Sequence, residues 1–150
     1  MKKFPILVLV FCVALTLSVY AKPKPVNSLI GIKLGDPSGQ VMKVLGNKAF
    51  AYKSVITLDT RKVINAVTVI LDDNNKVETI MVQAPAYIIN IQGVKFGAGP
   101  ADVRKVFGEP DIKTDKWGIV TWEYFKYNLL FSFEDDACNG VTVHDYSKDK

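Results

Sequence analysis

A duplicated segment constrains the fold of this chain more than any other feature of its sequence. Residues 31–47 match residues 93–109 without a gap at an offset of 62, and seven of the 17 positions are identical. Unrelated segments of average composition would share about one identity over this length. We therefore expect two copies of one structural unit, and any predicted fold must contain that unit twice.

Each copy predicts a short helix between two glycines. Asp36 is the expected N-cap of the first helix, and Pro100 opens the second. Gly46 and Gly108 are expected to end the two helices, so a backbone role explains these glycines without a phosphate-binding loop. Apolar residues at helical spacing give each helix one apolar side: Val41, Val44 and Leu45, and then Val103, Val106 and Phe107. Val44 and Val106 are predicted to occupy equivalent buried positions.

After each predicted helix, the hydrophobic period changes from 3.6 to 2, which is typical of strands. The expected strands are 52–58, 66–71 and 77–82 in the first copy, and 118–125, 129–133 and 141–143 in the second. We predict an α+β fold of two tandem helix-plus-three-strand repeats, which form one antiparallel sheet with both helices on one face. Val69 and Phe131 are expected to face the helices, and Leu130 and Ser132 to face the other way.

The first 21 residues have the pattern of a cleavable signal peptide. Lys2 and Lys3 precede an apolar stretch over residues 4–19, and Ala21 offers a small residue for cleavage. The apolar stretch has 16 residues, fewer than the roughly 20 that cross a bilayer core. We predict cleavage before Lys22 and export to the periplasm or the extracellular space, with no stable membrane anchor after cleavage.

Cleavage would leave 129 residues, which is enough for one compact domain. The expected division is a signal peptide (1–21), an exposed N-terminal segment (22–29), a first repeat (30–83), a connection (84–92), a second repeat (93–146) and a tail (147–150). The signal carries two of the 19 basic residues and none of the 15 acidic ones, so the mature net charge falls to +2. No long basic run remains, and a nucleic-acid partner is not expected. Cys138 is then the only cysteine, so the mature chain can form no internal disulfide.

One stretch of the second copy resembles a known repeat. Gly-Val-Lys-Phe-Gly at residue 93, a helix ending Lys-Val-Phe-Gly-Glu-Pro-Asp at residue 111, and Thr-Trp-Glu-Tyr at 121–124 carry the resemblance. This repeat is shared by the β-lactamase-inhibitory protein-like and SmpA/OmlA families, the latter being lipoproteins of the outer-membrane β-barrel assembly machinery. The resemblance covers residues 30–145, and the tandem arrangement looks more like the inhibitors. It implies a concave sheet surface that binds a protein, without implying catalysis or a target.

The chain also departs from both families. It has no cysteine for lipid attachment at the expected mature N-terminus, and the single Cys138 cannot reproduce the disulfide that each inhibitor repeat carries. The residues with which the inhibitors contact their partner lie outside the shared motif, so none can be assigned to positions here.

Catalytic chemistry has little support in the sequence. His144 is the only histidine, and a Cys138–His144 pair would have no evident orienting partner. No nucleophile elbow, zinc-binding helix or Cys-x-x-Cys motif is present. The acidic runs at 72–75 and 134–136 lack the spaced ligands of a calcium loop and are typical of hairpin turns. We expect neither enzymatic activity nor a cofactor, although a carboxylate pair formed by the tertiary fold stays open.

These arguments predict a monomeric, exported protein-binding module, either an enzyme inhibitor or an accessory protein of envelope assembly. The binding surface would be the sheet face opposite the helices. The alternative is a small-ligand-binding or structural protein of the cell envelope. The candidate partner-binding residues are Trp122, Tyr124, Tyr127, Leu130 and His144. Alternation does not decide which face Trp122 and Tyr124 occupy, and packing beneath the helices is the competing interpretation.

Overall fold

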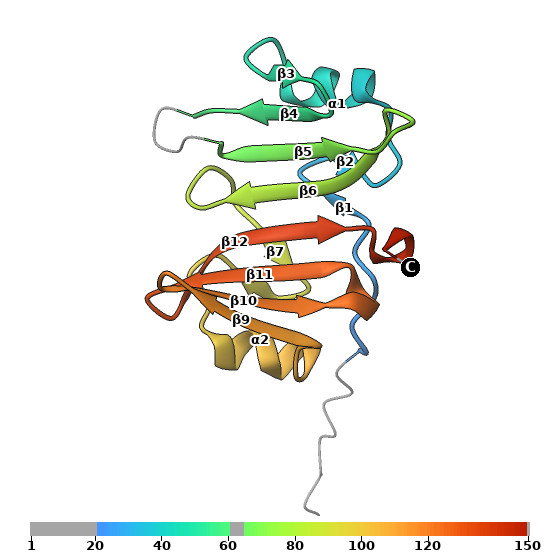
Figure 1. Ribbon diagram of the computed structural model, residues 1–150. Coiled ribbons are helices and arrows are strands. Elements are labelled where there is room, and N and C mark those ends of the chain that lie inside the picture. The colour runs from blue at the N-terminus through green and yellow to red at the C-terminus, as the bar shows by residue number, and fades with distance from the viewer. Residues whose placement is uncertain (1–20, 61–64, 150) are drawn as a thin grey trace, which may run out of the picture.

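A computed structural model of the chain describes residues 21–60 and 65–149 (Figure 1). The predicted signal peptide, except for Ala21, lies outside the described residues. Within the two described ranges, no helix is long and apolar enough to cross a membrane.

The two halves of the described chain contain the same order of elements. The first half consists of β1 (Ser28–Leu29), β2 (Ile32–Lys33), α1 (Ser38–Leu45), β3 (Phe50–Tyr52), β4 (Val55–Leu58), β5 (Val67–Leu71) and β6 (Val77–Gln83). The second consists of β7 (Asn90–Ile91), β8 (Val94–Lys95), α2 (Pro100–Phe107), β9 (Ile112–Lys116), β10 (Ile119–Tyr124), β11 (Leu129–Glu134) and β12 (Ala137–His144). Two short 3₁₀ helices, η1 (Phe125–Tyr127) and η2 (Tyr146–Lys148), follow β10 and β12.

Eight strands form one antiparallel sheet in the order β3-β4-β5-β6-β12-β11-β10-β9 (Figure 1). The two halves meet where β6 pairs with β12, with Ile80 opposite Val143 and Val82 opposite Val141. The β1-β2 and β7-β8 hairpins are separate two-stranded sheets. The sheet is therefore continuous across both halves of the chain.

The prediction of an α+β fold made of two helix-plus-three-strand repeats is wrong. The described chain is mostly β, because each half supplies four strands to the large sheet and a further hairpin ahead of its helix. Each of the two helices has only eight residues. Strand β9, Ile-Lys-Thr-Asp-Lys, escaped prediction because it is an edge strand whose residues are mostly exposed, so it carries charges instead of an apolar alternation.

A single hydrophobic cluster covers one face of the sheet. Val41 of α1 and Val103 of α2 are both fully buried in it, together with Val69 and Phe131 from the central strands. The ring of Phe107 lies 5.5 Å from that of Phe131. Both helices and both hairpins thus contribute to the same cluster, and we call the opposite side of the sheet the open face.

Two local predictions about the helices need correction. Val44 is 38% exposed and Val106 is half-buried, so the buried equivalents are Val41 and Val103. Helix α1 has only about two turns, and Val44 lies beside the β1-β2 turn, where a Cβ on Gly31 would be 3.7 Å from it.

Asp36 is not the N-cap of α1. Pro37 occupies that position, and Asp36 Oδ2 instead accepts a hydrogen bond from the backbone amide of Lys33 at 2.8 Å. The predicted helix ends are confirmed, since Gly46 and Gly108 adopt positive φ angles of 79° and 81° at the two C-caps.

The N-terminal segment, predicted to be exposed over 22–29, is partly packed against the fold. Leu29 belongs to β1 and is only 4% exposed. Upstream of it, the amide of Val26 donates to the carbonyl of Tyr127 at 2.9 Å. A segment at the start of the first half therefore contacts the second half.

Candidate functional site

The five residues predicted to bind a partner do not share one face of the sheet. Trp122 and Tyr124 are 5% and 2% exposed and belong to the core cluster. Tyr127 is half-buried and packs against the same cluster. Leu130 and His144 are half-buried, and they alternate with the buried residues of β11 and β12, so both lie on the open face. The proposed grouping is therefore split, and only Leu130 and His144 remain candidates.

Strand pairing explains why the aromatic residues of β10 face inward. Trp122 is the direct cross-strand partner of Phe131, and paired residues project from the same face. Phe131 is fully buried under the helices, so Trp122 lies there too. The Trp122 ring packs edge-on against Phe133, with centroids 5.2 Å apart.

Charged side chains cover the outer side of Trp122. The guanidinium of Arg104 and the ammonium of Lys113 each lie 5.1 Å from the centre of its ring. Glu109 holds both cations, at 2.7 Å from Arg104 Nε and 2.9 Å from Lys113 Nζ. The hydrogen bond from Lys113 lowers the pKa of the Glu109 carboxyl. These contacts have a structural role, because they complete the cover of a core residue.

Tyr124 is held in the same core. Its hydroxyl donates to the carbonyl of Gly108 at 3.1 Å, so the hydroxyl fastens β10 to the end of α2. Burial raises the pKa of Tyr124 to about 12. Tyr124 is thus a core residue whose hydroxyl already has a hydrogen-bond partner within the chain.

The open face carries a row of half-buried side chains that crosses six strands. Direct cross-strand pairing links its members, which are Thr57, Thr68, Met81, Thr142, Leu130 and Glu123, from β4 to β10. A second, shorter row consists of Val55, Ile70, Thr79 and His144. Apart from Glu123 and His144, these residues are apolar or bear a hydroxyl or thioether, so the centre of this face is weakly polar and uncharged.

At the β3 edge, the open face becomes aromatic. Phe50 and Tyr52 are the cross-strand partners of Thr57 and Val55, which places them on the open face. They are 67% and 63% exposed. The sequence did not predict this patch, because the expected strand 52–58 includes Tyr52 but not Phe50, and β3 was not expected as a separate strand.

Beside the two central strands, β6 and β12, the C-terminal residues fold over the open face. Thr79 Oγ1 lies 2.7 Å from His144 Nδ1, and His144 Nε2 lies 3.0 Å from Asp149 Oδ2. Because the Asp149 carboxylate can only accept, His144 Nε2 carries a proton in this arrangement. Tyr146 lies edge-on to His144, with ring centroids 4.7 Å apart.

The hydroxyl–imidazole–carboxylate chain of Thr79, His144 and Asp149 does not resemble an accessible nucleophile. Thr79 is only 7% exposed, so its hydroxyl is poorly accessible from solvent. The Cys138–His144 pair is not formed, because Cys138 is buried in the core cluster on the helix side. Burial raises the pKa of the Cys138 thiol to about 11, which keeps it protonated at neutral pH.

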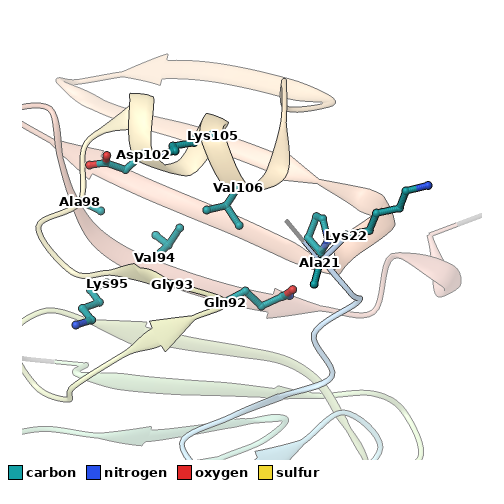
Figure 2. A pocket seen from close by; sticks show the side chains of 11 residues that line it. Ala21, Lys22, Gln92, Gly93, Val94, Lys95, Ala98, Asp102, Lys105 and Val106 are labelled. Carbon is teal, nitrogen blue, oxygen red and sulfur yellow. The ribbon is translucent and has the colours of Figure 1, made fainter. Parts of the chain in front are cut away.

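A hollow of about 660 Å³ lies between residues 21–23, the β7-β8 turn and α2 (Figure 2). Val94 and Val106 form its apolar floor, and Lys22 and Lys95 lie at its rim with their ammonium groups turned away from it in Figure 2. Gln92 holds the N-terminal segment at this place, accepting from the Lys24 amide at 2.9 Å and donating to the Lys24 carbonyl at 2.7 Å.

The described part of the chain shows no sign of a metal or an unpaired polar site. No group of three or more His, Cys, Asp or Glu side chains is placed there to hold a metal ion. Every buried side-chain nitrogen or oxygen in this part has a hydrogen-bond partner. The open face and the N-terminal hollow are therefore the candidate sites.

Comparison with known proteins supports a fold but no function. No family model and no curated protein matches this chain. A solved structure, that of the DUF4309 family protein YjgB from Bacillus subtilis, is similar with a TM-score of 0.53 and 13% sequence identity. The similarity covers 83% of this chain and 88% of that one. At this identity the likeness shows the fold alone, and the resemblance to the β-lactamase-inhibitory and SmpA/OmlA families stays a prediction.

Proposed function

We propose that this chain is an exported, non-catalytic module that binds a protein partner through the open face of its sheet. The observation that carries the proposal is the exposed aromatic pair Phe50 and Tyr52, at 67% and 63% exposure, which continues into the half-buried rows of the open face. Exposed aromatic side chains that adjoin a weakly polar sheet face form the kind of surface to which protein partners bind. Export rests on the pattern of the first 21 residues.

The dimensions of the open face favour a protein over a small molecule. Six strands, from β4 to β10, contribute to the central row, and at the usual strand spacing of about 4.8 Å the row is roughly 24 Å long. A surface of that width suits a protein interface, whereas small ligands need a concave pocket that encloses them. Aromatic side chains such as Tyr52 are typical anchors of protein interfaces, and the threonine hydroxyls can both donate and accept.

A second candidate function, the binding of a small ligand, is favoured by one observation. The hollow at residues 21–23 has a volume of about 660 Å³, within the range of ligand sites. Its floor is apolar at Val94 and Val106, but the described residues that line it include no buried unpaired polar group to orient a ligand. The protein-binding proposal therefore has the stronger support.

Capture of partners from the native cell envelope tests the proposal. Met81→Glu places a charge in the middle of the open face, and Tyr52→Ala removes the aromatic edge. We expect each variant to fold normally and to capture the partner at least tenfold less than the parent chain, because the anchors and the apolar contact are lost. Lys22→Glu, at the rim of the hollow, is the matched control and should capture the same amount. Undiminished capture by both open-face variants would exclude this face as the binding surface.

A further inference from the structure

The C-terminal residues of the chain occupy one end of the open face. After β12, the chain turns back through η2, and the end of the chain lies beside β12 in Figure 1. The Tyr146 ring is placed between Phe125, at a centroid distance of 4.8 Å, and His144, at 4.7 Å. Tyr146 thus lies in a slot whose two walls are aromatic rings from β12 and η1.

The end of this slot is a hydrogen-bond acceptor. The hydroxyl of Tyr146 donates to Glu123 Oε2 at 3.0 Å, and Glu123 belongs to the central row of the open face. Burial, together with the negative charge of Glu123, raises the pKa of Tyr146 above its ordinary range. The phenol is therefore neutral and donates. We call Phe125, His144 and Glu123 the tyrosine slot.

The His144 ring, and the backbones of Phe125 and Glu123, are held by contacts that do not involve Tyr146. His144 is fixed on its Nδ1 side by Thr79 at 2.7 Å. The amide of Phe125 donates to Asp111 Oδ2 at 2.8 Å, and Glu123 pairs with Leu130 in the sheet. A hollow of about 440 Å³, lined by Glu123, Phe125, Tyr146 and Asp149, continues beside the ring. The His144 ring and the backbone on which Phe125 and Glu123 stand are thus held without Tyr146, and there is room next to the present occupant.

The remaining contacts of the tail are polar and close to solvent. Lys148 Nζ lies 2.7 Å from Asp72 Oδ2, and the two side chains are 39% and 15% exposed. Asp149, which contacts His144, has a side chain that is 51% exposed. Ion pairs near the surface contribute little to stability. Tyr146 is therefore the main apolar anchor of a segment that a competing ligand could displace.

We propose that the tyrosine slot is a binding site for a tyrosine side chain of a protein partner, and that Tyr146 occupies it as an internal ligand. This inference rests on the proposed function, since it names the chemistry that one end of the open face recognises. The slot fits an aromatic ring between Phe125 and His144 with a hydroxyl that donates to Glu123. Phenylalanine would leave the Glu123 carboxylate without its donor, and phosphotyrosine would bring a second negative charge against it.

The full-length variant Tyr146→Ala empties the slot and allows a direct test with N-acetyl-tyrosinamide. NMR titration should show this probe shifting the signals of Phe125 and His144 in the variant, and at least tenfold weaker binding to the parent chain, where Tyr146 competes. N-acetyl-phenylalaninamide should bind the variant at least fivefold more weakly than the tyrosine probe, because it cannot donate to Glu123. The double variant Glu123→Ala, Tyr146→Ala should lose this preference.

A second variant keeps the test decisive if Tyr146→Ala does not fold. Tyr146→Phe loses only the hydrogen bond to Glu123. The tyrosine probe should therefore displace the tail and bind this variant with severalfold higher affinity than the parent chain. Equal binding of the two probes to folded Tyr146→Ala, or no gain in affinity for Tyr146→Phe, would overturn the inference. The probes need no natural partner, so their binding is measured independently of partner capture. Failure of partner capture therefore refutes the proposed function without affecting this result.

Discussion

At the scale of single residues, the two tryptophans of the chain take opposite environments only five positions apart. Trp117 is 98% exposed at the tip of the β9-β10 hairpin, where it adopts a positive φ of 54°. Trp122 is 5% exposed, packed on Phe133 and covered by Arg104. Residue type alone therefore does not decide burial here, whereas strand pairing does.

This difference makes the two positions a matched pair for mutation. Trp122→Ala removes a large buried ring and should lower the free energy of unfolding by about 3–5 kcal/mol. Trp117→Ala should change it by less than about 0.5 kcal/mol, because the side chain has almost no contacts to lose. Urea unfolding followed by circular dichroism measures both. A Trp122→Ala chain as stable as the parent would contradict the core position of this ring.

At the scale of elements, each short helix presents one narrow side to the sheet. Val41 of α1 is fully buried, whereas Val44, one turn later, is 38% exposed beside the β1-β2 turn. The periodic pattern that predicts the helix includes both residues, so it overstates the width of the buried side. Periodic patterns also describe the edge strands poorly, because β3 is exposed along its whole length and β9 is mostly polar.

The orientation of α1 can be tested by truncating each valine in turn. Val41→Ala should reduce the free energy of unfolding by about 1–3 kcal/mol, through lost burial and a residual cavity. Val44→Ala should cost less than about 1 kcal/mol, because its side chain is already partly in water. Denaturant unfolding of the two variants compares them directly, and a larger loss for Val44→Ala would mean that the helix is rotated about its axis.

At the scale of the whole molecule, the two halves are joined by main-chain pairing and by the ends of the chain. Strand β6 pairs with β12 at the centre of the sheet. The N-terminal segment reaches the second half through Val26 and Tyr127, and Lys148 reaches the first half through Asp72 at 2.7 Å. The chain should therefore unfold as one cooperative unit.

Alkaline pH should lower the free energy of unfolding of the chain. Burial raises the pKa of Tyr124 to about 12 and raises that of Tyr146 above its ordinary range, so the folded state favours their neutral forms. The contribution of each tyrosine to the free energy of unfolding is fully present below the pKa of about 10 that a tyrosine has in the unfolded chain. It is lost as the pH rises through the pKa that the same tyrosine has in the folded chain. The free energy of unfolding should therefore fall between pH 10 and 12. Replacing both tyrosines by phenylalanine should flatten this decline, and an unchanged slope would assign it to other groups.

Local sequence predicted those features that depend on near neighbours. The helix ends at Gly46 and Gly108, and the alternation that turns Val69 inward and Leu130 outward, follow from backbone conformation and a period of two within one strand. The exposed edge strands β3 and β9 were missed because they carry no apolar alternation that a local pattern could detect.

The candidate site depends on contacts between distant parts of the chain, and only the tertiary structure decided it. Trp122 faces the core because β10 pairs with β11 in the register that puts it opposite Phe131. Tyr146 reaches Glu123, and His144 reaches Thr79, because β12 lies between β6 and β11 in the sheet. A one-residue change of register would turn every side chain of a strand to the other face. Register between strands that are far apart in sequence is set by the packing of the whole sheet, and no local pattern of residues encodes it.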